Sequence, residues 1–459
     1  MTSSSESLAE SLAAAVKSGM PRAWDELAGL VALRSVANPA IEPVSECRAA
    51  ASMVAGLFTG VGVEGVAELE TPDGSLAVVG RSAGPQGSPR VVLYSHYDVV
   101  PAGDPEGWDT DPWVLTAHDG RWHGRGAADC KGNLVAMLLA LRSLREVLGE
   151  WPVEVAVVCE GSEEQSSGGM EQLARSRPDL VACDAFVLAD TGNVALGQPT
   201  LTTSLRGTGS VLVTVRTMGH AAHSGMYGGA APDALQALLM ALGSLRDETG
   251  ETTIDGLDHD GVWDGAAFEP ERFREDAGLL DGVEPLTGSA TIADRLWARP
   301  AATVLAIDCP PIAQVTAAAQ GEARAVVNLR VPAGVDAMGA QELLIAHLRA
   351  HTPFGAQVDV RPVSLGQGFR ARTEGPAYQA MRRAMRTAFG RGAVTAGQGG
   401  SIPLAVTLAE VVPEAEVLLM GVEEPAARIH APGESVDPGE LRRTALALAL
   451  FLADLGGRC

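Results

Sequence analysis

Two ionisable residues, His96 and Asp98, stand in an apolar run that reads VVLYSHYDVVP over residues 91–101. Residues two apart in a strand point to the same side, so the Asp98 carboxylate can lie beside the His96 imidazole. A carboxylate that is hydrogen-bonded to a metal-ligating imidazole fixes its tautomer and orientation. The pair therefore suits a metal ligand with its orienting partner, although the stretch taken alone favours a structural core histidine.

Three further carboxylates occupy chemically suggestive positions. Asp129 lies in the glycine-rich segment WHGRGAADCKGN, directly before a predicted helix, and by itself it is best interpreted as a helix cap. Glu163 and Glu164 follow the apolar strand VEVAVV. Adjacent like charges fit a solvated turn, but they also fit a pair in which one carboxylate binds a metal while its neighbour takes a proton from metal-bound water.

Two more candidates come later in the chain. Asp190 ends the segment FVLAD, and His430 lies in the proline- and glycine-containing segment RIHAPGESV. Each is compatible with an ordinary loop residue. Two imidazoles, two terminal carboxylates and one bridging carboxylate are nevertheless the ligand set of a binuclear zinc site, whose ions lie about 3.5–4 Å apart. Together, the candidates favour a metal site made of His96, Asp129, Glu164, Asp190 and His430.

The elements that must position these residues alternate between short β-branched runs and Ala/Leu-rich helical patterns over the first 190 residues or so. This alternation predicts βαβ units and a mostly parallel sheet between helices, hence an α/β fold. Ligands of such sheets gather outside the carboxyl ends of the strands. Most of the candidate ligands lie just past apolar strand runs, where that rule expects them.

The pattern changes near Leu205, where GSVLVTVRTMG and later ARAVVNLRVP and AQVDVRPVS alternate with period two around a helical stretch. This indicates an α+β domain inserted into the first one. The predicted division is a catalytic domain from residues 1–205 and 369–459, with an inserted domain over 206–368. The strand EVLLMGV and a closing helix belong to the last part.

Composition excludes several partners. The 459 residues carry 34 basic and 57 acidic side chains, a net charge of -23, which argues against nucleic acid and anionic membrane. The N-terminus is predicted to be an amphipathic helix rather than a signal peptide, and no apolar run reaches membrane-spanning length. Six cysteines without paired spacing fit reduced thiols and predict a cytoplasmic protein.

Eight blocks in order resemble a known family: SHYDVVP, HGRGAADCKGN, EGSEEQSSGG, VLADTG, GHAAHSGMYGG, VVNLRVP, GGSIP and IHAPGES. They are similar to the carnosinase-type dipeptidases, within the di-zinc metallopeptidase family that also holds aminoacylases and glutamate carboxypeptidases. The resemblance implies a zinc-peptidase-like catalytic domain with an inserted lid and dimerisation domain. It also implies a cis peptide bond between Asp129 and Cys130.

By the same resemblance, His96 and Asp190 hold one zinc ion, Glu164 and His430 hold the other, and Asp129 bridges them. Asp98 orients His96. Glu163 is the general base that activates the water between the zinc ions. Manganese and cobalt accept similar ligands, so the metal in the cell stays open.

The resemblance also implies residues that contact the substrate, in the inserted domain and in a loop after it. His223 resembles the histidine that reaches across a dimer to the scissile carbonyl, and Arg330 resembles the arginine that binds the substrate carboxylate. Gly400 and Ser401 resemble a loop that holds the C-terminal end of the substrate. The resemblance thus implies a homodimer formed through the inserted domain, although for His223 a plain loop residue stays possible from the residues alone.

The predicted reaction is metal-dependent hydrolysis of an amide bond in dipeptides or small peptide-like substrates with a free carboxylate. The alternatives are an N-acyl amino acid deacylase or biosynthetic amidohydrolase on the same scaffold, and a non-catalytic binding protein. Four positions depart from the family pattern: Cys130, Gly397, Gln398 and Gly433. They leave the side-chain preference open.

Overall fold

The computed structural model describes residues 2–400 and 402–458. The chain divides into two compact units: unit 1 comprises 1–203, 371–396 and 403–459, and unit 2 comprises 204–370 and 397–402. Residues 397–402, which the predicted boundaries assign to the catalytic domain, thus belong to unit 2. The assignment of catalysis to one domain and of a lid to the other stays a prediction.

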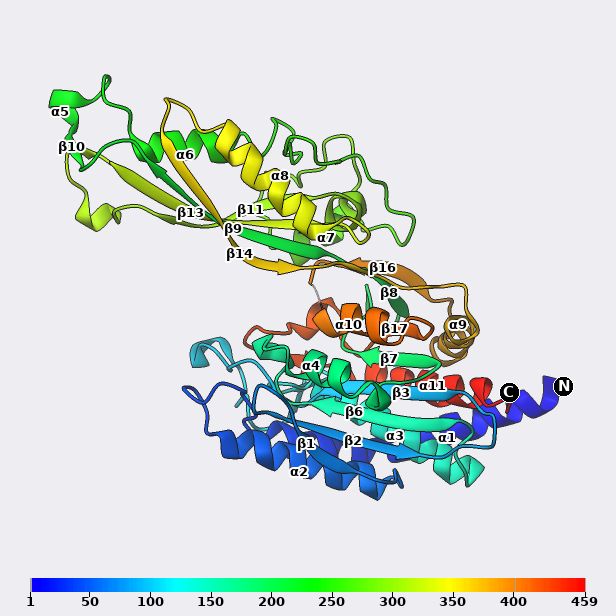
Figure 1. Ribbon diagram of the computed structural model, residues 1–459. Helices are drawn as coiled ribbons and strands as arrows, with labels where there is room; N and C mark the ends of the chain where they lie inside the picture. Colours follow the sequence, from blue (N-terminus) through cyan, green and yellow to red (C-terminus); the bar gives the residue numbers. More distant parts are fainter. Residues whose placement is uncertain (1, 401, 459) are drawn as a thin grey trace. The chain divides into compact units, whose positions relative to one another are not determined.

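Unit 1 is built on a twisted sheet whose strands follow the order β1-β2-β6-β3-β7-β17-β8 (Figure 1). The four central strands β6, β3, β7 and β17 run parallel, and β1, β2 and β8 are antiparallel to their neighbours. The strands are β1 (Ala67–Glu70), β2 (Leu76–Ser82), β3 (Arg90–His96), β6 (Glu154–Glu160), β7 (Ala185–Ala189), β8 (Thr200–Leu205) and β17 (Glu416–Met420). The predicted α/β fold with a mostly parallel central sheet is confirmed.

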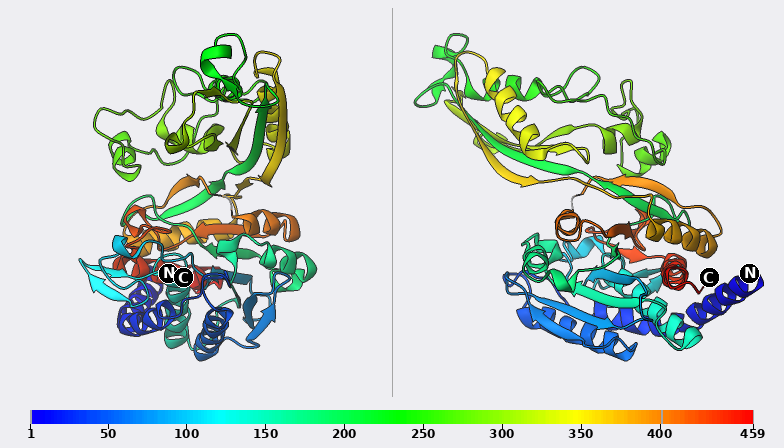
Figure 2. Two further views of the ribbon diagram at one scale, coloured as in Figure 1. Left: turned by 90° about the vertical axis from the view of Figure 1, so that its left-hand side faces the viewer. Right: turned by 45° about the vertical axis from the view of Figure 1, so that its right-hand side comes forward.

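Helices cover both faces of this sheet (Figures 1 and 2). They are α1 (Thr2–Val31), α2 (Val44–Gly60), α3 (Lys131–Leu148), α4 (Gly169–Ser176), α9 (Pro376–Phe389), α10 (Pro403–Val411) and α11 (Pro438–Leu455). The β3–α3–β6 and β6–α4–β7 crossovers step in opposite directions along the sheet, so right-handed connections place α3 and α4 on opposite faces. Accordingly, α4 packs on α10, whereas α3 packs on α1 and α11.

The core of unit 1 forms because its central strands and α3 are apolar on more than one side. All residues of β3 after Arg90 are buried, as expected for a strand covered on both faces. Helix α3 is buried along most of its length because it lies between the sheet and the outer helices α1 and α11. A second, small sheet of unit 1 consists of β4 (Thr116–His118), β5 (Arg121–His123) and β18 (Ser435–Val436).

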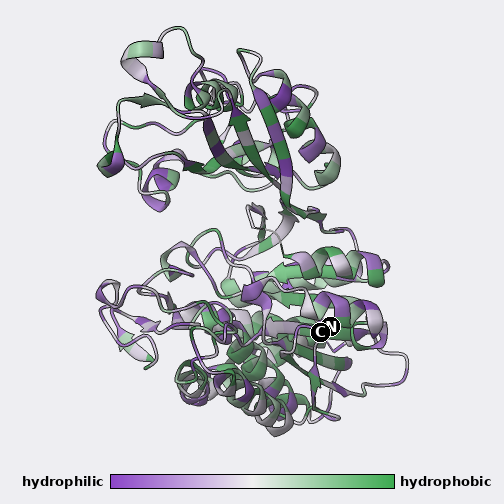
Figure 3. Ribbon diagram, turned by 60° about the vertical axis from the view of Figure 1, so that its left-hand side comes forward, coloured by the Kyte–Doolittle hydropathy of each residue, from purple (hydrophilic) through white to green (hydrophobic). Residues whose placement is uncertain are grey.

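Unit 2 contains a four-stranded antiparallel sheet in the order β11-β13-β9-β14. Its strands alternate between hydrophobic and hydrophilic residues (Figure 3), because α6 and α8 cover one face. The elements are β9 (Gly207–Arg216), β10 (Ala222–His223), α5 (Ser224–Tyr227), α6 (Ala234–Gly243), α7 (Pro270–Asp276), β11 (Ala301–Asp308), β12 (Ala318–Ala319), β13 (Glu322–Val331), α8 (Ala337–Ala350), β14 (Gln357–Gly366) and β15 (Phe369–Arg370). Strand β16 (Val394–Gln398) pairs with β8. No helix among the described residues is long and apolar enough to cross a membrane.

Packing at the centre of unit 1 is testable at Leu93, which is fully buried in β3. We expect Leu93→Ala to lower the free energy of unfolding by about 2–5 kcal/mol, because it removes buried methyl groups and leaves a cavity. Leu196→Ala is the control, since Leu196 is 55% exposed, and its effect should stay within about 0.5 kcal/mol. Denaturant unfolding of metal-free protein measures both; equal losses would contradict the core assignment.

Candidate metal centre

The six residues predicted to bind metal or move protons lie at one edge of unit 1. His96 is the last residue of β3, Asp190 directly follows β7, and Glu163 and Glu164 begin a short 3-10 turn after β6. Asp129 precedes α3, and His430 lies in the segment after β17. Because the four central strands run parallel, their carboxyl ends meet at this edge, and the side chains converge there.

The Asp129 carboxylate lies between the two histidines. Its Oδ1 is 3.1 Å from Nε2 of His96, and its Oδ2 is 2.9 Å from Nε2 of His430. One carboxylate thus offers a different oxygen to each imidazole, which is the geometry of a bridging ligand. The peptide bond between Asp129 and Cys130 is cis, as the resemblance implies.

Each histidine has a second carboxylate beside it. Nε2 of His96 is 3.0 Å from Oδ1 of Asp190, and Nε2 of His430 is 3.1 Å from Oε1 of Glu164. Within each resulting group the possible ligand atoms lie within 4.8 Å of one another. The two groups share Asp129, so the structure brings all five predicted ligands together as two joined sites.

The Asp98 carboxylate lies beside the His96 ring, but the spacing of a strand is not what places it there. Strand β3 ends at His96, so the two-residue spacing of a strand does not place Asp98. The closest contact of His96 Nδ1 is the backbone oxygen of Asp98, at 3.1 Å, and the Asp98 carboxylate is 3.4 Å away. That carboxylate instead accepts backbone N–H groups of Glu163 and Glu164, both at 3.1 Å. Asp98 therefore connects the His96 ring to the turn that carries both glutamates.

The Glu163 carboxyl group has the environment of a proton carrier. Burial, followed by the negative charge of Asp190, raises the pKa of Glu163 well above its ordinary 4.5. A general base works best when its pKa lies near the working pH, and raising a glutamate by burial is a common way to reach it. The position suits the proton transfer proposed for Glu163.

The cluster also suits bound cations. Burial raises the pKa of both Glu164 and Asp190, because charged carboxylates are poorly solvated there. Hydrogen bonds to Asp129 and Glu164 raise the pKa of His430 to about 10. In metal-free protein, bound protons therefore balance the negative charge of these carboxylates. Divalent ions bound in the same place would balance that charge instead of the protons. The donor set of imidazole nitrogens and carboxylate oxygens fits such ions.

Sequence reasoning missed Glu423, and it named Cys130 only as a departure from the family pattern. The Cys130 thiol lies within the His96 group and donates to the backbone oxygen of Ala189 at 2.9 Å. Glu423 is buried and accepts from the Asn133 amide at 3.2 Å. The sequence did contain a pattern that could have pointed to Glu423. Like Glu163 and Glu164, it belongs to a pair of adjacent acidic residues just after an apolar strand, here β17.

Two other departures have a physical reason in the structure. Gly433 has a φ of +84°, in the left-handed region that glycine and asparagine tolerate best. A Cβ on Gly397 would lie only 2.4 Å from the ring of Trp297 in unit 2, so a side chain there would displace the indole.

The predicted substrate residues belong to unit 2. His223 is exposed, and its Nδ1 accepts the N–H of Gly225 at 3.1 Å, which leaves the proton on Nε2. Arg330 is half-buried in β13, and its Nη1 has no hydrogen-bond partner within 2–400 and 402–458. Gly400 lies in an exposed bend, and Ser401 is outside the described residues.

A carboxylate shared between two histidine–carboxylate pairs at the edge of an α/β sheet is a donor set of the kind with which metal-dependent hydrolases hold two divalent ions. Residues 92–454 match the model of Peptidase family M20/M25/M40, and the chain belongs to this family. The family binds divalent metal ions. The predicted membership of a metallopeptidase family is therefore confirmed.

Among the relatives, a cysteinylglycine-S-conjugate dipeptidase of Corynebacterium striatum is 43% identical over 84% of this chain and 85% of its own length. A beta-Ala-His dipeptidase of Rattus norvegicus is 28% identical over 76% of this chain and 73% of its own. The structure of human carnosine dipeptidase 1 superposes with a TM-score of 0.80 at 23% identity, covering 98% of this chain and 99% of that one. This structure supports the fold, and the two dipeptidase relatives confirm the predicted resemblance to the dipeptidases of the family.

Metal binding should release protons. The pKa of His430 is raised to about 10, so in metal-free protein the ring stays protonated through neutral pH and must lose its proton to become a ligand. Metal affinity should therefore rise as pH is raised from 6 to about 8, because fewer protons then compete. Titration calorimetry in buffers of different ionisation enthalpy measures the protons released; a heat independent of the buffer would contradict this expectation.

Proposed function

We propose that this protein hydrolyses the peptide bond of dipeptides that carry a free carboxylate, by a two-metal mechanism with Glu163 as the general base. The observation that carries the proposal is the Asp129 carboxylate, shared at 3.1 and 2.9 Å between His96 and His430. The relative that is 43% identical supports dipeptides as substrates, and cysteinylglycine and its S-conjugates are the first candidates.

We assign His96, Asp129 and Asp190 to one ion and Asp129, Glu164 and His430 to the other. Zinc suits these nitrogen and oxygen donors best, and manganese and cobalt are the alternatives. When bound, such ions lower the pKa of a water molecule and polarise a carbonyl oxygen.

The side chains of Glu163 and Asp98 are proposed to move the proton and to keep the site in position. Glu163 takes a proton from the attacking water and returns it to the amine nitrogen as the peptide bond breaks. Asp98 holds the Glu163–Glu164 turn through two backbone N–H groups, so the base and the neighbouring ligand keep a common position. The carbonyl carbon of the substrate is attacked and the free amine leaves, with no covalent enzyme intermediate.

Three groups of unit 2 are proposed to recognise the substrate. Nη1 of Arg330, which has no hydrogen-bond partner among the described residues, is a donor for the substrate carboxylate. Nε2–H of His223 is a donor for the oxygen of the scissile carbonyl. Gly400 and Ser401 are assigned to the C-terminal end of the substrate. Apart from the chain neighbours of Gly400, no heavy atom of the described residues lies within 4 Å of a Cβ built on it, which leaves room there.

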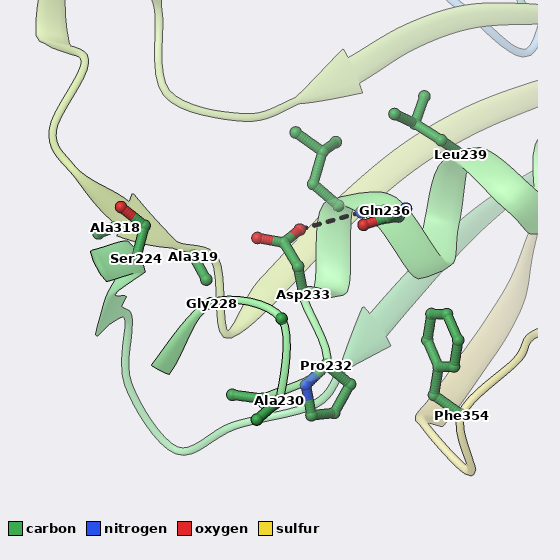
Figure 4. A pocket seen from close by; sticks show the side chains of 13 residues that line it. Ser224, Gly228, Ala230, Pro232, Asp233, Gln236, Leu239, Ala318, Ala319 and Phe354 are labelled. Atoms are coloured by element: carbon green, nitrogen blue, oxygen red, sulfur yellow. Dashed lines mark hydrogen bonds between the residues drawn. The ribbon is translucent and has the colours of Figure 1, made fainter. Parts of the chain in front are cut away.

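A homodimer formed through unit 2 is part of the proposal. Beside His223 lies a cavity of about 960 Å³, which includes Ser224, Asp233, Leu239 and Phe354 in its lining (Figure 4). Large hydrophobic side chains stand exposed on the neighbouring α5 and α6: Met226, Tyr227, Leu239 and Met240. An exposed apolar patch of this kind suits a protein–protein interface. The free thiols and acidic charge fit a cytoplasmic location.

A deacylase that removes acetyl or succinyl groups from amino acids would use the same metals and base. The two activities differ in the group on the amine side of the scissile bond. We expect kcat/KM to be higher for cysteinylglycine, its S-conjugates and beta-Ala-His than for acetyl- and succinyl-amino acids. The reverse order would replace the dipeptidase with the deacylase.

Glu163→Gln should keep the bound metal and lose turnover by about 100-fold or more, because a general base contributes roughly 10²–10⁴-fold to the rate. Metal content by elemental analysis and kcat with cysteinylglycine measure the two effects. The control is Glu171→Gln, which changes a glutamate in the adjacent α4 and should leave kcat nearly unchanged. A Glu163→Gln protein that turns over at the wild-type rate would contradict the assignment of Glu163 as the general base.

The proposed role of His223 across a dimer can be tested by mixing. Glu163→Ala and His223→Ala proteins should each be nearly inactive, but a mixture that exchanges subunits should regain part of the wild-type activity. The regained activity comes from hybrids in which one site has both an intact base and an intact donor. Exchange is followed with differently tagged chains; no recovery despite exchange would count against a shared site.

A further inference from the structure

The carboxylate of Glu434 is fully buried and is saturated by four donors. Its Oε1 accepts the backbone N–H groups of Ala128 at 3.0 Å and Asp129 at 3.1 Å. Its Oε2 accepts the N–H of Gly126 at 3.0 Å and Nη1 of Arg125 at 2.6 Å. Hydrogen bonds to an ionised acceptor are the strong ones, so this carboxylate holds the segment before Asp129 firmly.

Glu434 also belongs to the segment that carries His430. Its backbone oxygen accepts the N–H of Gly124 at 3.0 Å, and β18 pairs with β5 directly after it. Nη2 of Arg125 donates to the backbone oxygen of Ala431 at 3.2 Å, so the same pair of side chains holds this segment at a second point. Two loops far apart in sequence, one with Asp129 and one with His430, are thereby tied together.

The hydrogen bonds of Glu434 and Arg125 that join the two loops matter most for the position of His430. Its side chain is 53% exposed, whereas that of His96 is 1% exposed, so packing restrains it far less. Its backbone has a φ of +61°, a left-handed conformation that a non-glycine residue keeps only where the surroundings hold it. The anchor at Glu434 follows four residues later in the chain.

We propose that Glu434 is a positioning residue that sets the Asp129 carboxylate against the His430 imidazole and so determines the metal affinity of the group formed by Asp129, Glu164 and His430. This inference rests on the proposed metal centre. A carboxylate is required because three backbone N–H groups and a guanidinium converge on it. A glutamine would turn its own NH₂ group toward two of these donors and leave them unpaired in a buried place.

The test compares Glu434→Gln with Glu416→Gln, in full-length protein loaded with Zn²⁺ or Co²⁺. Glu416 is the matched control, since it is buried and accepts the N–H groups of Ala377 and Tyr378, both at 2.9 Å, at the start of α9. We expect Glu434→Gln to weaken metal binding by about 10–100-fold, the usual cost of losing a partner behind a metal ligand. Competition with a chelator measures the affinity.

Two readouts separate positioning from general damage. The visible spectrum of the Co²⁺-loaded Glu434→Gln protein should change, and the amides of Gly126, Ala128 and Asp129 should exchange faster in its metal-free form. Glu416→Gln should lower the melting temperature without changing metal affinity or the spectrum. Equal losses of affinity in both variants, or an unchanged affinity in Glu434→Gln, would overturn the inference.

If Glu434→Gln does not fold, Glu434→Asp replaces it. The shorter side chain keeps the charge that faces Arg125 but cannot reach all three N–H groups, so metal binding should still weaken, and wild-type affinity in this variant would overturn the inference. A wild-type protein that binds no divalent metal would instead refute the proposed metal centre itself. The two failures are therefore distinguishable.

Discussion

Carboxylates that converge in a buried place repel one another, and the structure of unit 1 is organised around this electrostatic cost. Asp129, Glu164 and Asp190 contact His96 or His430, and the buried Glu163 carboxyl group lies within the electrostatic influence of Asp190, Asp98 and Glu164. Such a group is stable only when positive charge is present among its members, as protons or as metal ions. The parallel strands bring these side chains to one edge, and the positive charge allows them to remain there.

The carboxylates of Asp98, Asp129, Glu163, Glu164, Asp190 and Glu434, which form or support the proposed metal centre, fall into two kinds according to what faces them. Both Asp98 and Glu434 accept backbone N–H groups, and Glu434 also accepts from the guanidinium of Arg125, so hydrogen-bond donors stabilise their negative charge. The others face imidazoles and each other. A carboxylate surrounded by N–H donors is a rigid anchor, whereas one that faces other carboxylates is available to bind a cation or a proton. The division explains how a set of loops can position reactive groups to within ångströms.

Much of this arrangement could be predicted because it depends on local pattern. The four central strands are short apolar runs, and the rule that ligands gather at their carboxyl ends placed His96, Asp190 and the glutamate pair correctly. The anchors could not be predicted in the same way. Glu434 meets residues 126–129 across more than 300 positions of chain, and no periodicity reports such a contact. Asp98 was placed by a strand argument, yet the strand ends at His96 and a backbone oxygen makes the closer contact.

The order of the proposed ligands along the chain has a consequence for how the protein is made. His96, Asp129, Glu164 and Asp190 all precede unit 2, whereas His430 and Glu434 follow it. A growing chain that leaves the ribosome can assemble the group around His96 early, but the second group waits until almost all of the polypeptide has been synthesised. A product truncated within unit 2 therefore keeps four of the five proposed ligands and the proposed base Glu163, but it lacks His430 and Glu434, so its second group stays incomplete.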